Sequence, residues 1–214
     1  MGKENGSNRL ERESILRIAV GRDAIVRFPE IERKFAVKEI PKDLDQFPFM
    51  DIVQVYDSEG IRYRKAVSFP PDGSGLATTY TATLKHIKPN TGKVIKVEYE
   101  AEINEQIYNT AVQKSQNEGR ITIFKRRFLI PDKSSGRVIH FDIFAGALEG
   151  LVVAEVEFPN RKTADKYNPP SWISKDLTIH GALSNKHISF CGLPDKFKSV
   201  LQFNHFKQVL SGNS

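Results

Sequence analysis

With 214 residues, of which 39% are hydrophobic and 27% charged, the chain has the composition of one soluble domain with a sizeable core. It has no apolar run long enough for a membrane helix, and its first residues, MGKENGSNRLERES, lack the apolar centre of a signal peptide. Cys191 is the only cysteine, so we expect no intrachain disulfide and a reducing, cytoplasmic location. The net charge of +6 suits nucleic acid, an anionic surface or a polyanionic small molecule, and only the placement of the charges can decide among them.

The predicted elements begin with a helix over 10–20, LERESILRIAV, in which apolar residues recur at helical spacing. The middle of the chain then alternates apolar and polar residues in runs rich in Val, Ile, Phe, Tyr and Thr, separated by turn signals such as PPDGSG and KPNTG. These runs predict eight strands, at 30–37, 51–57, 61–67, 79–87, 93–103, 120–130, 137–144 and 151–158. Eight strands in one domain of this size favour a barrel or a sandwich.

Two further helices are predicted. One covers 104–119, with Asn104 as its cap and Gly119 at its end, and the other covers 193–210. The predicted organisation is therefore an N-terminal extension with a helix over 1–28, a strand-rich domain over 29–190 and a C-terminal helix over 191–214.

Charged residues recur at every second position along the strands. In PEIERKFAV (29–37), Glu30, Glu32 and Lys34 share one face, and Ile31, Arg33, Phe35 and Val37 share the other. Acidic pairs and basic pairs follow on separate strands, whereas a merely soluble surface tends to mix the two signs. The residues with this spacing or alignment are Arg62 and Arg64, Lys85, Glu98 and Glu100, Lys125 and Arg127, Asp142, and Glu155 and Glu157.

A charged face usually points to water, and for any single strand that interpretation is preferred. Taken together, the segregated charges favour an inward face, because a barrel of about eight strands holds either side chains or one small ligand. Desolvated charges must then be paired or bound to ions. Clustered carboxylates favour a hard divalent cation, and clustered Arg and Lys favour phosphate oxygens. Metal and phosphate together are the requirements of phosphoryl transfer.

Several motifs occur in the order found in one known family. Glu30-Ile31-Glu32-Arg33-Lys34 resembles the ExExK signature of the CYTH superfamily, the triphosphate tunnel metalloenzymes. Further segments resemble other conserved motifs of this superfamily. They are Arg62-Tyr63-Arg64, Leu84-Lys85, Lys96 to Glu100, Lys125 to Phe128, Phe141 to Phe144, Gly150 to Glu157, and Trp172 to Thr178 with Asn185. The chain departs from the family pattern at Ser174, Asp176, Ala182 and Leu183, the last two of which replace an Arg-Tyr pair.

The resemblance implies a closed eight-stranded antiparallel β-barrel with flanking helices, whose tunnel hydrolyses a triphosphate, with tripolyphosphate the expected substrate. It implies Mg²⁺ (or Mn²⁺) bound by Glu30, Glu32, Asp142, Glu155 and Glu157. Phosphate binding is implied for Lys34, Arg62, Arg64, Lys85, Lys125 and Arg127, and catalytic roles for Glu98, Glu100 and Lys34.

Alternatives on the same scaffold are a class IV adenylyl cyclase and a thiamine triphosphatase, and from another class a noncatalytic polyphosphate-binding module. We expect a small-molecule triphosphate as partner and neither membrane nor nucleic acid. The five histidines, at 86, 140, 180, 187 and 205, show no metal-ligand spacing and are interpreted as ordinary residues.

Overall fold

The computed structural model describes residues 26–70, 75–90 and 93–197, with only the backbone of 26–30, 86–90 and 93–97. The predicted helix over 10–20 and most of the one over 193–210 lie outside these ranges. None of the helices within them is long and apolar enough to cross a membrane.

The described chain is mainly antiparallel β-sheet with a few flanking helices. The strands are β1 (Val26–Glu30), β2 (Glu32–Val37), β3 (Phe49–Tyr56), β4 (Arg62–Phe69), β5 (Ala77–Asn90), β6 (Lys93–Glu102), β7 (Ile123–Asp132), β8 (Arg137–Ala145), β9 (Val152–Glu157) and β10 (Ile173–Asp176). The helices are η1 (Leu44–Gln46), α2 (Glu105–Asn117), η2 (Gly146–Leu148), α3 (Arg161–Asp165), η3 (Gly181–Leu183) and α4 (Asn185–Cys191). Seven of the eight predicted strands and the helix capped by Asn104 are confirmed, and the predicted strand over 30–37 is divided between β1 and β2. Strand β10, helices α3 and α4 and the short η segments were not predicted.

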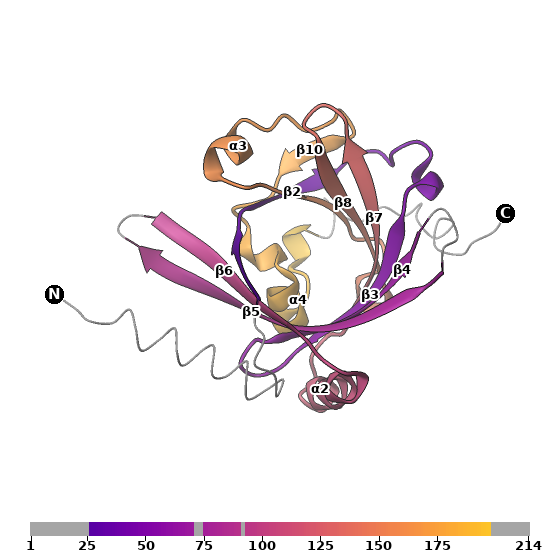
Figure 1. Cartoon of the computed structure of the whole chain (residues 1–214), viewed down its shortest axis with the longest axis vertical. Coiled ribbons are helices and arrows are strands. Elements are labelled where there is room, and N and C mark those ends of the chain that lie inside the picture. The colour runs from indigo at the N-terminus through magenta and orange to yellow at the C-terminus, as the bar shows by residue number, and fades with distance from the viewer. Residues whose placement is uncertain (1–25, 71–74, 91–92, 198–214) are drawn as a thin grey trace.

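The sheet curls strongly (Figure 1) but its hydrogen-bonded order is open, β1-β6-β5-β4-β3-β7-β8-β9-β2-β10. The prediction of a closed eight-stranded barrel is therefore wrong in two respects. The predicted strand over 30–37 is split at Ile31 into β1, which pairs with β6, and β2, which pairs with β9. Since β9 and β10 occupy both edges of β2, no ladder joins β2 to the other end of the sheet.

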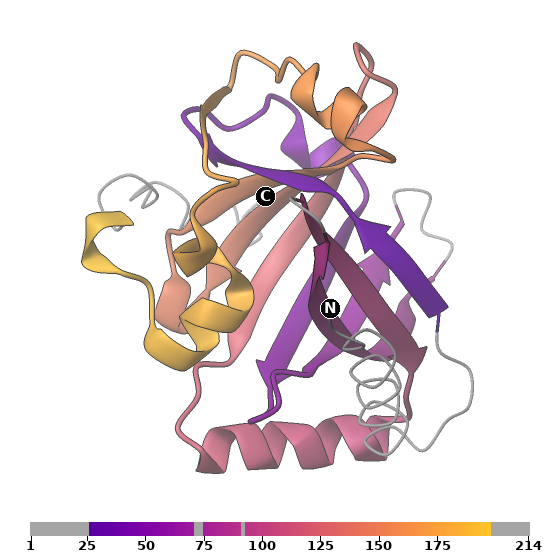
Figure 2. The ribbon, with the colours of Figure 1, turned by 90° about the vertical axis from the view of Figure 1, so that its left-hand side faces the viewer.

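Much of the outer face of the sheet is apolar and packs against helices. Tyr63, Leu84 and Tyr99 pack with Tyr108 of α2, and α2 runs across one end of the strands (Figure 2). Phe35 and Phe141 pack with Tyr167, next to α3. Burial of this face explains why the alternating strands turn their charged positions the other way.

The inner face is apolar at one end only. There Ala36 of β2 and Val153 of β9 pack with Ile123, with Leu183 of η3 and with Ile188 of α4. Helix α4 begins here because Ser184 is its N-cap. The Ser184 hydroxyl accepts a hydrogen bond from the backbone amide of His187. The charged positions of the inner face begin one alternation away from this cluster.

Candidate active site

The register of the sheet collects the charged positions on one face. Directly opposed residues of an antiparallel pair share a face, as do residues two apart in one strand. Arg62 lies opposite Thr83, which lies opposite Glu100, and Arg64 lies opposite Gln54. Repeating these two relations across the strands places every predicted site residue whose side chain is described on the same face. These residues are Glu32, Lys34, Arg62, Arg64, Lys85, Glu98, Glu100, Lys125, Arg127, Asp142, Glu155 and Glu157.

Glu30 is the exception. It lies on β1, opposite Lys96 of β6, and its side chain lies outside the description. The backbone places it two residues before Glu32.

In strand β2, the alternation of side chains between the two faces separates a residue of the site from a residue that supports the fold. On the inner face, Lys34 Nζ lies 2.9 Å from Glu155 Oε1 and donates a hydrogen bond to the carbonyl oxygen of Leu183 at 2.9 Å. On the outer face, Arg33 binds the Asp176 carboxylate at 2.7 Å and the carbonyl oxygens of the α3 segment. Lys34 therefore belongs to the site, and Arg33 holds the surrounding chain in place.

Asp176 and Leu183, two positions at which the chain departs from the family pattern, both make contacts that support this site. Asp176 is the partner of Arg33, and Leu183 is a buried apolar residue whose backbone oxygen caps Lys34. This segment thus contributes a backbone carbonyl and packing to the site, with no cationic side chain at 182 or 183.

A buried ion-pair network joins β7, β8 and β9. Arg127 donates hydrogen bonds from Nε and Nη2 to the two oxygens of Asp142, at 2.6 and 2.7 Å. Its Nη2 also donates to Glu155 Oε2 at 2.7 Å. Lys125 Nζ lies 2.6 Å from Asp142 Oδ2, with the two side chains 3% and 0% exposed. These cations and anions neutralise one another.

The pKa values reflect this pairing. Burial alone would raise the pKa of Glu155, but Lys34, Lys125 and Arg127 hold it well below its ordinary value. Burial and the charge of Arg127 lower the pKa of Lys125 to about 8, against the opposing effect of Asp142. Burial disfavours the Lys34 cation, yet Glu155 and Glu32 leave its pKa raised.

In the opposite part of the face, on β4, β5 and β6, the arginines contact their carboxylate at longer distances. Arg62 and Arg64 share the Glu100 carboxylate at 3.5 and 3.8 Å, while Thr83 donates to the same oxygen at 2.8 Å. Lys85 Nζ lies 2.6 Å from Glu98 Oε1. Burial, with the charges of Arg62 and Arg127, lowers the pKa of Arg64 to about 10 although Glu100 opposes this.

The arginine pair leaves donors unused. The buried Nε atoms of Arg62 and Arg64 have no hydrogen-bond partner within the described part of the chain. Buried donors are almost always paired in native proteins. Two guanidinium groups that share one distant carboxylate and retain free N–H groups fit an anion with several oxygens, such as a phosphate chain.

Carboxylates face each other where β2 pairs with β9, since Glu32 lies directly opposite Glu157. Burial, with the charges of Glu32 and Glu98, raises the pKa of Glu157 even though Arg127 opposes it. Like charges directly opposed on paired strands are unfavourable, and oxygen donors of this kind suit a hard cation.

The donor chemistry of Glu32 and Glu157 therefore fits Mg²⁺ or Mn²⁺. Asp142 and Glu155, which were also predicted to bind metal, are engaged by lysine and arginine. Among the residues whose side chains are described, no three His, Cys, Asp or Glu side chains converge on a single point.

The sequence interpretation missed His140, which it treated as ordinary. On β8 it lies opposite Glu155, and its Nδ1 is 3.1 Å from Nη1 of Arg127. Burial and the Arg127 charge lower the pKa of His140 to about 4, so the ring is neutral at neutral pH. Its position two residues before Asp142, on the same face of the strand, is the signal that would have included it.

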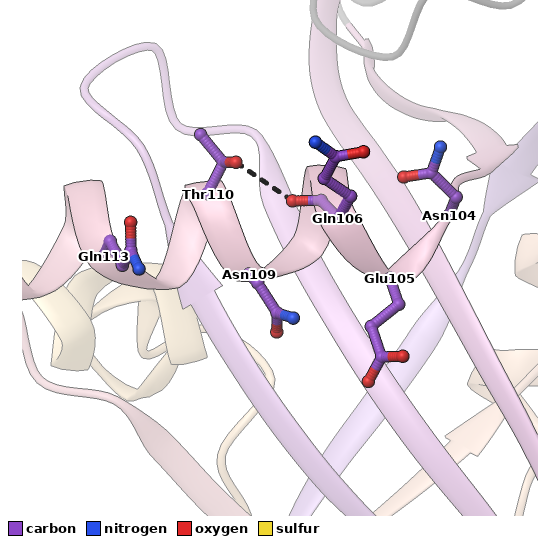
Figure 3. Close-up of a pocket in the computed structure, with 6 residues that line it drawn as sticks. All are labelled: Asn104, Glu105, Gln106, Asn109, Thr110 and Gln113. Carbon is purple, nitrogen blue, oxygen red and sulfur yellow. Dashed lines mark hydrogen bonds between the residues drawn. The ribbon is translucent and has the colours of Figure 1, made fainter.

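A separate hollow of about 640 Å³ lies along α2, away from this face (Figure 3). It is lined by polar side chains of one helix, among them Asn104, Gln106 and Gln113, and by none of the charged residues of the sheet. We assign the chemistry to the inner face of the sheet.

A curled antiparallel sheet with arginines and opposed carboxylates on its inner face is the arrangement expected of a protein that binds phosphate chains. No protein-family model matches the chain. It is 30% identical over 165 residues to the inorganic triphosphatase of Nitrosomonas europaea, a match that covers 75% of this chain and 96% of that protein. The chain belongs to the inorganic triphosphatase family.

One solved structure agrees with this fold, and a second is reported beside it. The crystal structure of the hypothetical protein NE1496 matches with a TM-score of 0.50 at 28% identity, over 77% of this chain and 99% of that one. A structure of the inorganic triphosphatase NE1496 has a TM-score of 0.49 at 27% identity, over 75% and 93% of the two chains.

Proposed function

We propose that this protein hydrolyses inorganic tripolyphosphate to pyrophosphate and phosphate with Mg²⁺ or Mn²⁺ on the inner face of its curled sheet. The observation that supports this most directly is the pair Arg62 and Arg64, whose buried Nε atoms lack partners in the described chain. Family membership supports the same reaction. The single free cysteine, exposed at Cys191, agrees with a reducing cytoplasm.

Arg62 and Arg64 would bind the phosphate chain through their free N–H groups, and Lys85 would add a cation beside them. Lys34, Lys125 and Arg127 act differently, because their main contacts are carboxylates of the protein. They hold Asp142 and Glu155 ionised and in place, and present their remaining N–H groups to the phosphates.

Glu98 and Glu100 would orient the attacking water. Burial opposes ionisation of Glu98, but Lys85 and Arg62 outweigh it and lower its pKa, so its carboxylate accepts hydrogen bonds at neutral pH. The water oxygen bonds to the terminal phosphorus as the bridging P–O bond breaks, pyrophosphate leaves with the bridging oxygen, and the water gives up one proton to the solvent. Glu32, Glu157 and the neighbouring Glu30 would hold the metal ion, which supplies charge neutralisation on the phosphoryl oxygens.

The apolar end of the inner face favours an unsubstituted phosphate chain. Next to the charged positions, Leu183 and Ile188 pack against Ala36 and Val153, so buried aliphatic side chains fill this end of the inner face and a base has no open space among them.

The test is incubation of the purified full chain with tripolyphosphate, ATP or thiamine triphosphate, with and without Mg²⁺ or Mn²⁺, followed by identification of products. We expect pyrophosphate and phosphate from tripolyphosphate at a rate well above that for the other two. Cyclic AMP from ATP would instead establish a cyclase, and thiamine diphosphate as the preferred product a thiamine triphosphatase. Tight binding of tripolyphosphate without turnover would establish a binding module.

A further inference from the structure

The Arg127 guanidinium is almost fully engaged by the protein. Of its five N–H groups, the one on Nε and both on Nη2 are directed to Asp142 and Glu155. One N–H of Nη1 reaches Nδ1 of His140 at 3.1 Å. A single N–H, on Nη1, is left for any other acceptor.

His140 therefore adds the contact that holds the Nη1 end of the group, from which this last N–H projects. The two carboxylates hold the Nε and Nη2 edge of the planar group, and the His140 contact holds the Nη1 end. With all three contacts made, the guanidinium cannot turn without losing a hydrogen bond.

The same contact determines which ring nitrogen of His140 carries the proton. Every guanidinium N–H is a donor, so Nδ1 must accept, and the proton of the neutral ring resides on Nε2. Nε2 makes no hydrogen bond within the described part of the chain, and the side chain is 21% exposed. Its N–H is a second donor beside the free one on Nη1.

We propose that His140 is a positioning residue that holds Arg127 so that one Nη1 N–H, together with Nε2–H of His140 itself, meets the oxygens of a bound triphosphate. The inference rests on the proposed function for the identity of the anion, but its geometry does not depend on it. An ordinary buried histidine would fill space here without a defined tautomer or an effect on substrate binding.

Substitutions at His140 separate these roles. In His140→Asn the amide oxygen stands close to the place of Nδ1 and still accepts from Arg127, whereas His140→Phe keeps the ring shape and removes both nitrogens. We expect His140→Phe to raise KM for tripolyphosphate about tenfold with kcat changed less, and His140→Asn to recover most of that loss. His180→Phe, on the η3 side of the domain, is the matched control and should leave KM unchanged.

A double-mutant cycle tests whether His140 acts through Arg127. Arg127→Lys keeps the charge but removes the fork, so adding His140→Phe to it should change KM much less than in the wild-type background. Equal effects in both backgrounds, or an Asn variant as impaired as the Phe variant, would overturn the positioning role.

The tautomer of His140 can be measured without any enzymatic turnover, from the NMR signals of its ring nitrogens in the folded protein. We expect a neutral His140 ring protonated at Nε2 at neutral pH, and a change in its Nε2 signal when tripolyphosphate is added. A proton on Nδ1 would overturn the inference even if the enzyme is fully active. Failure of the wild type to hydrolyse tripolyphosphate would overturn the proposed function instead, leaving the tautomer to decide the role of His140.

Discussion

Glu32 and Glu157 lie directly opposite each other on the paired strands β2 and β9, so the sheet itself brings two carboxylates together. Their repulsion is the structural reason to expect a cation at this place. Glu157 is 69% exposed, and its carboxylate lies 3.9 Å from Nδ1 of His140, whereas Glu155, two residues earlier on the same face, lies 2.7 Å from Arg127.

Replacing Glu157 by Gln should therefore impair metal use more than folding. We expect tripolyphosphate turnover to fall at least tenfold and the required Mg²⁺ concentration to rise. Because partial burial, Glu32 and Glu98 raise the pKa of Glu157, its carboxylate opposes folding once the pH exceeds that raised value, and this contribution is absent in the Gln variant.

The measurement is turnover against Mg²⁺ concentration, with thermal melts of both proteins in chelator at neutral pH. The melting temperature of Glu157→Gln should equal or slightly exceed that of the wild type. Full activity of the wild type in excess chelator, or an unchanged metal dependence in the variant, would remove Glu157 from the metal site.

Arg64→Ala should weaken substrate binding. A single charge-assisted hydrogen bond contributes roughly 1.5–3 kcal/mol, so kcat/KM should fall on the order of 10- to 150-fold. Arg126→Ala is the matched control, because Arg126 lies on the outer face and binds Asp51 at 2.8 Å. Equal losses in the two variants would show that the face on which an arginine lies does not matter, contrary to the site described.

Asp142→Asn should destabilise the fold. The side chain is fully buried between Lys125 and Arg127, and removing its charge leaves two buried cations undercompensated. Breaking a buried pair in this way costs about 3–5 kcal/mol in the free energy of unfolding. Asp51→Asn removes the 42% exposed partner of Arg126 and should cost about 0–1 kcal/mol. Denaturant unfolding of the three proteins checks this, and similar midpoints for both variants would contradict it.

The same network predicts sensitivity to acid. Burial favours the protonated forms of Asp142 and Glu155, but the neighbouring cations lower the pKa of both carboxyl groups below their ordinary values. The folded state then binds protons less tightly than the unfolded state. Its stabilisation is present above the ordinary pKa of about 4 and is lost as the pH falls through the lower folded values.

Melting temperatures measured from pH 7 down to pH 3, in chelator, should therefore decrease steeply at the acid end. Asp142→Asn should show a flatter profile from a lower starting point. A wild-type melting temperature that is constant across this range would mean that these carboxyl groups are not paired as described.

The periodicity of the strands, and with it the face that each charged residue shares, could be predicted from the amino-acid sequence. Glu32 and Lys34 were separated from Arg33 and Phe35 by alternation alone, and the structure places them on opposite faces as expected. This works because a side chain's face in a strand depends on its parity in the chain, a purely local property.

Which charges neutralise each other could be seen only in the folded chain. Lys125 and Asp142 meet because β7 pairs with β8 in one register, and Lys34 meets Glu155 across strands far apart in the chain. The same holds for His140, which gains its role from Arg127 on the neighbouring strand. The split at Ile31 and the open order of the sheet were equally out of reach, because β10 takes the edge of β2 that closure would need. Pairing partners, registers and strand edges depend on contacts between distant segments, and no local pattern encodes them.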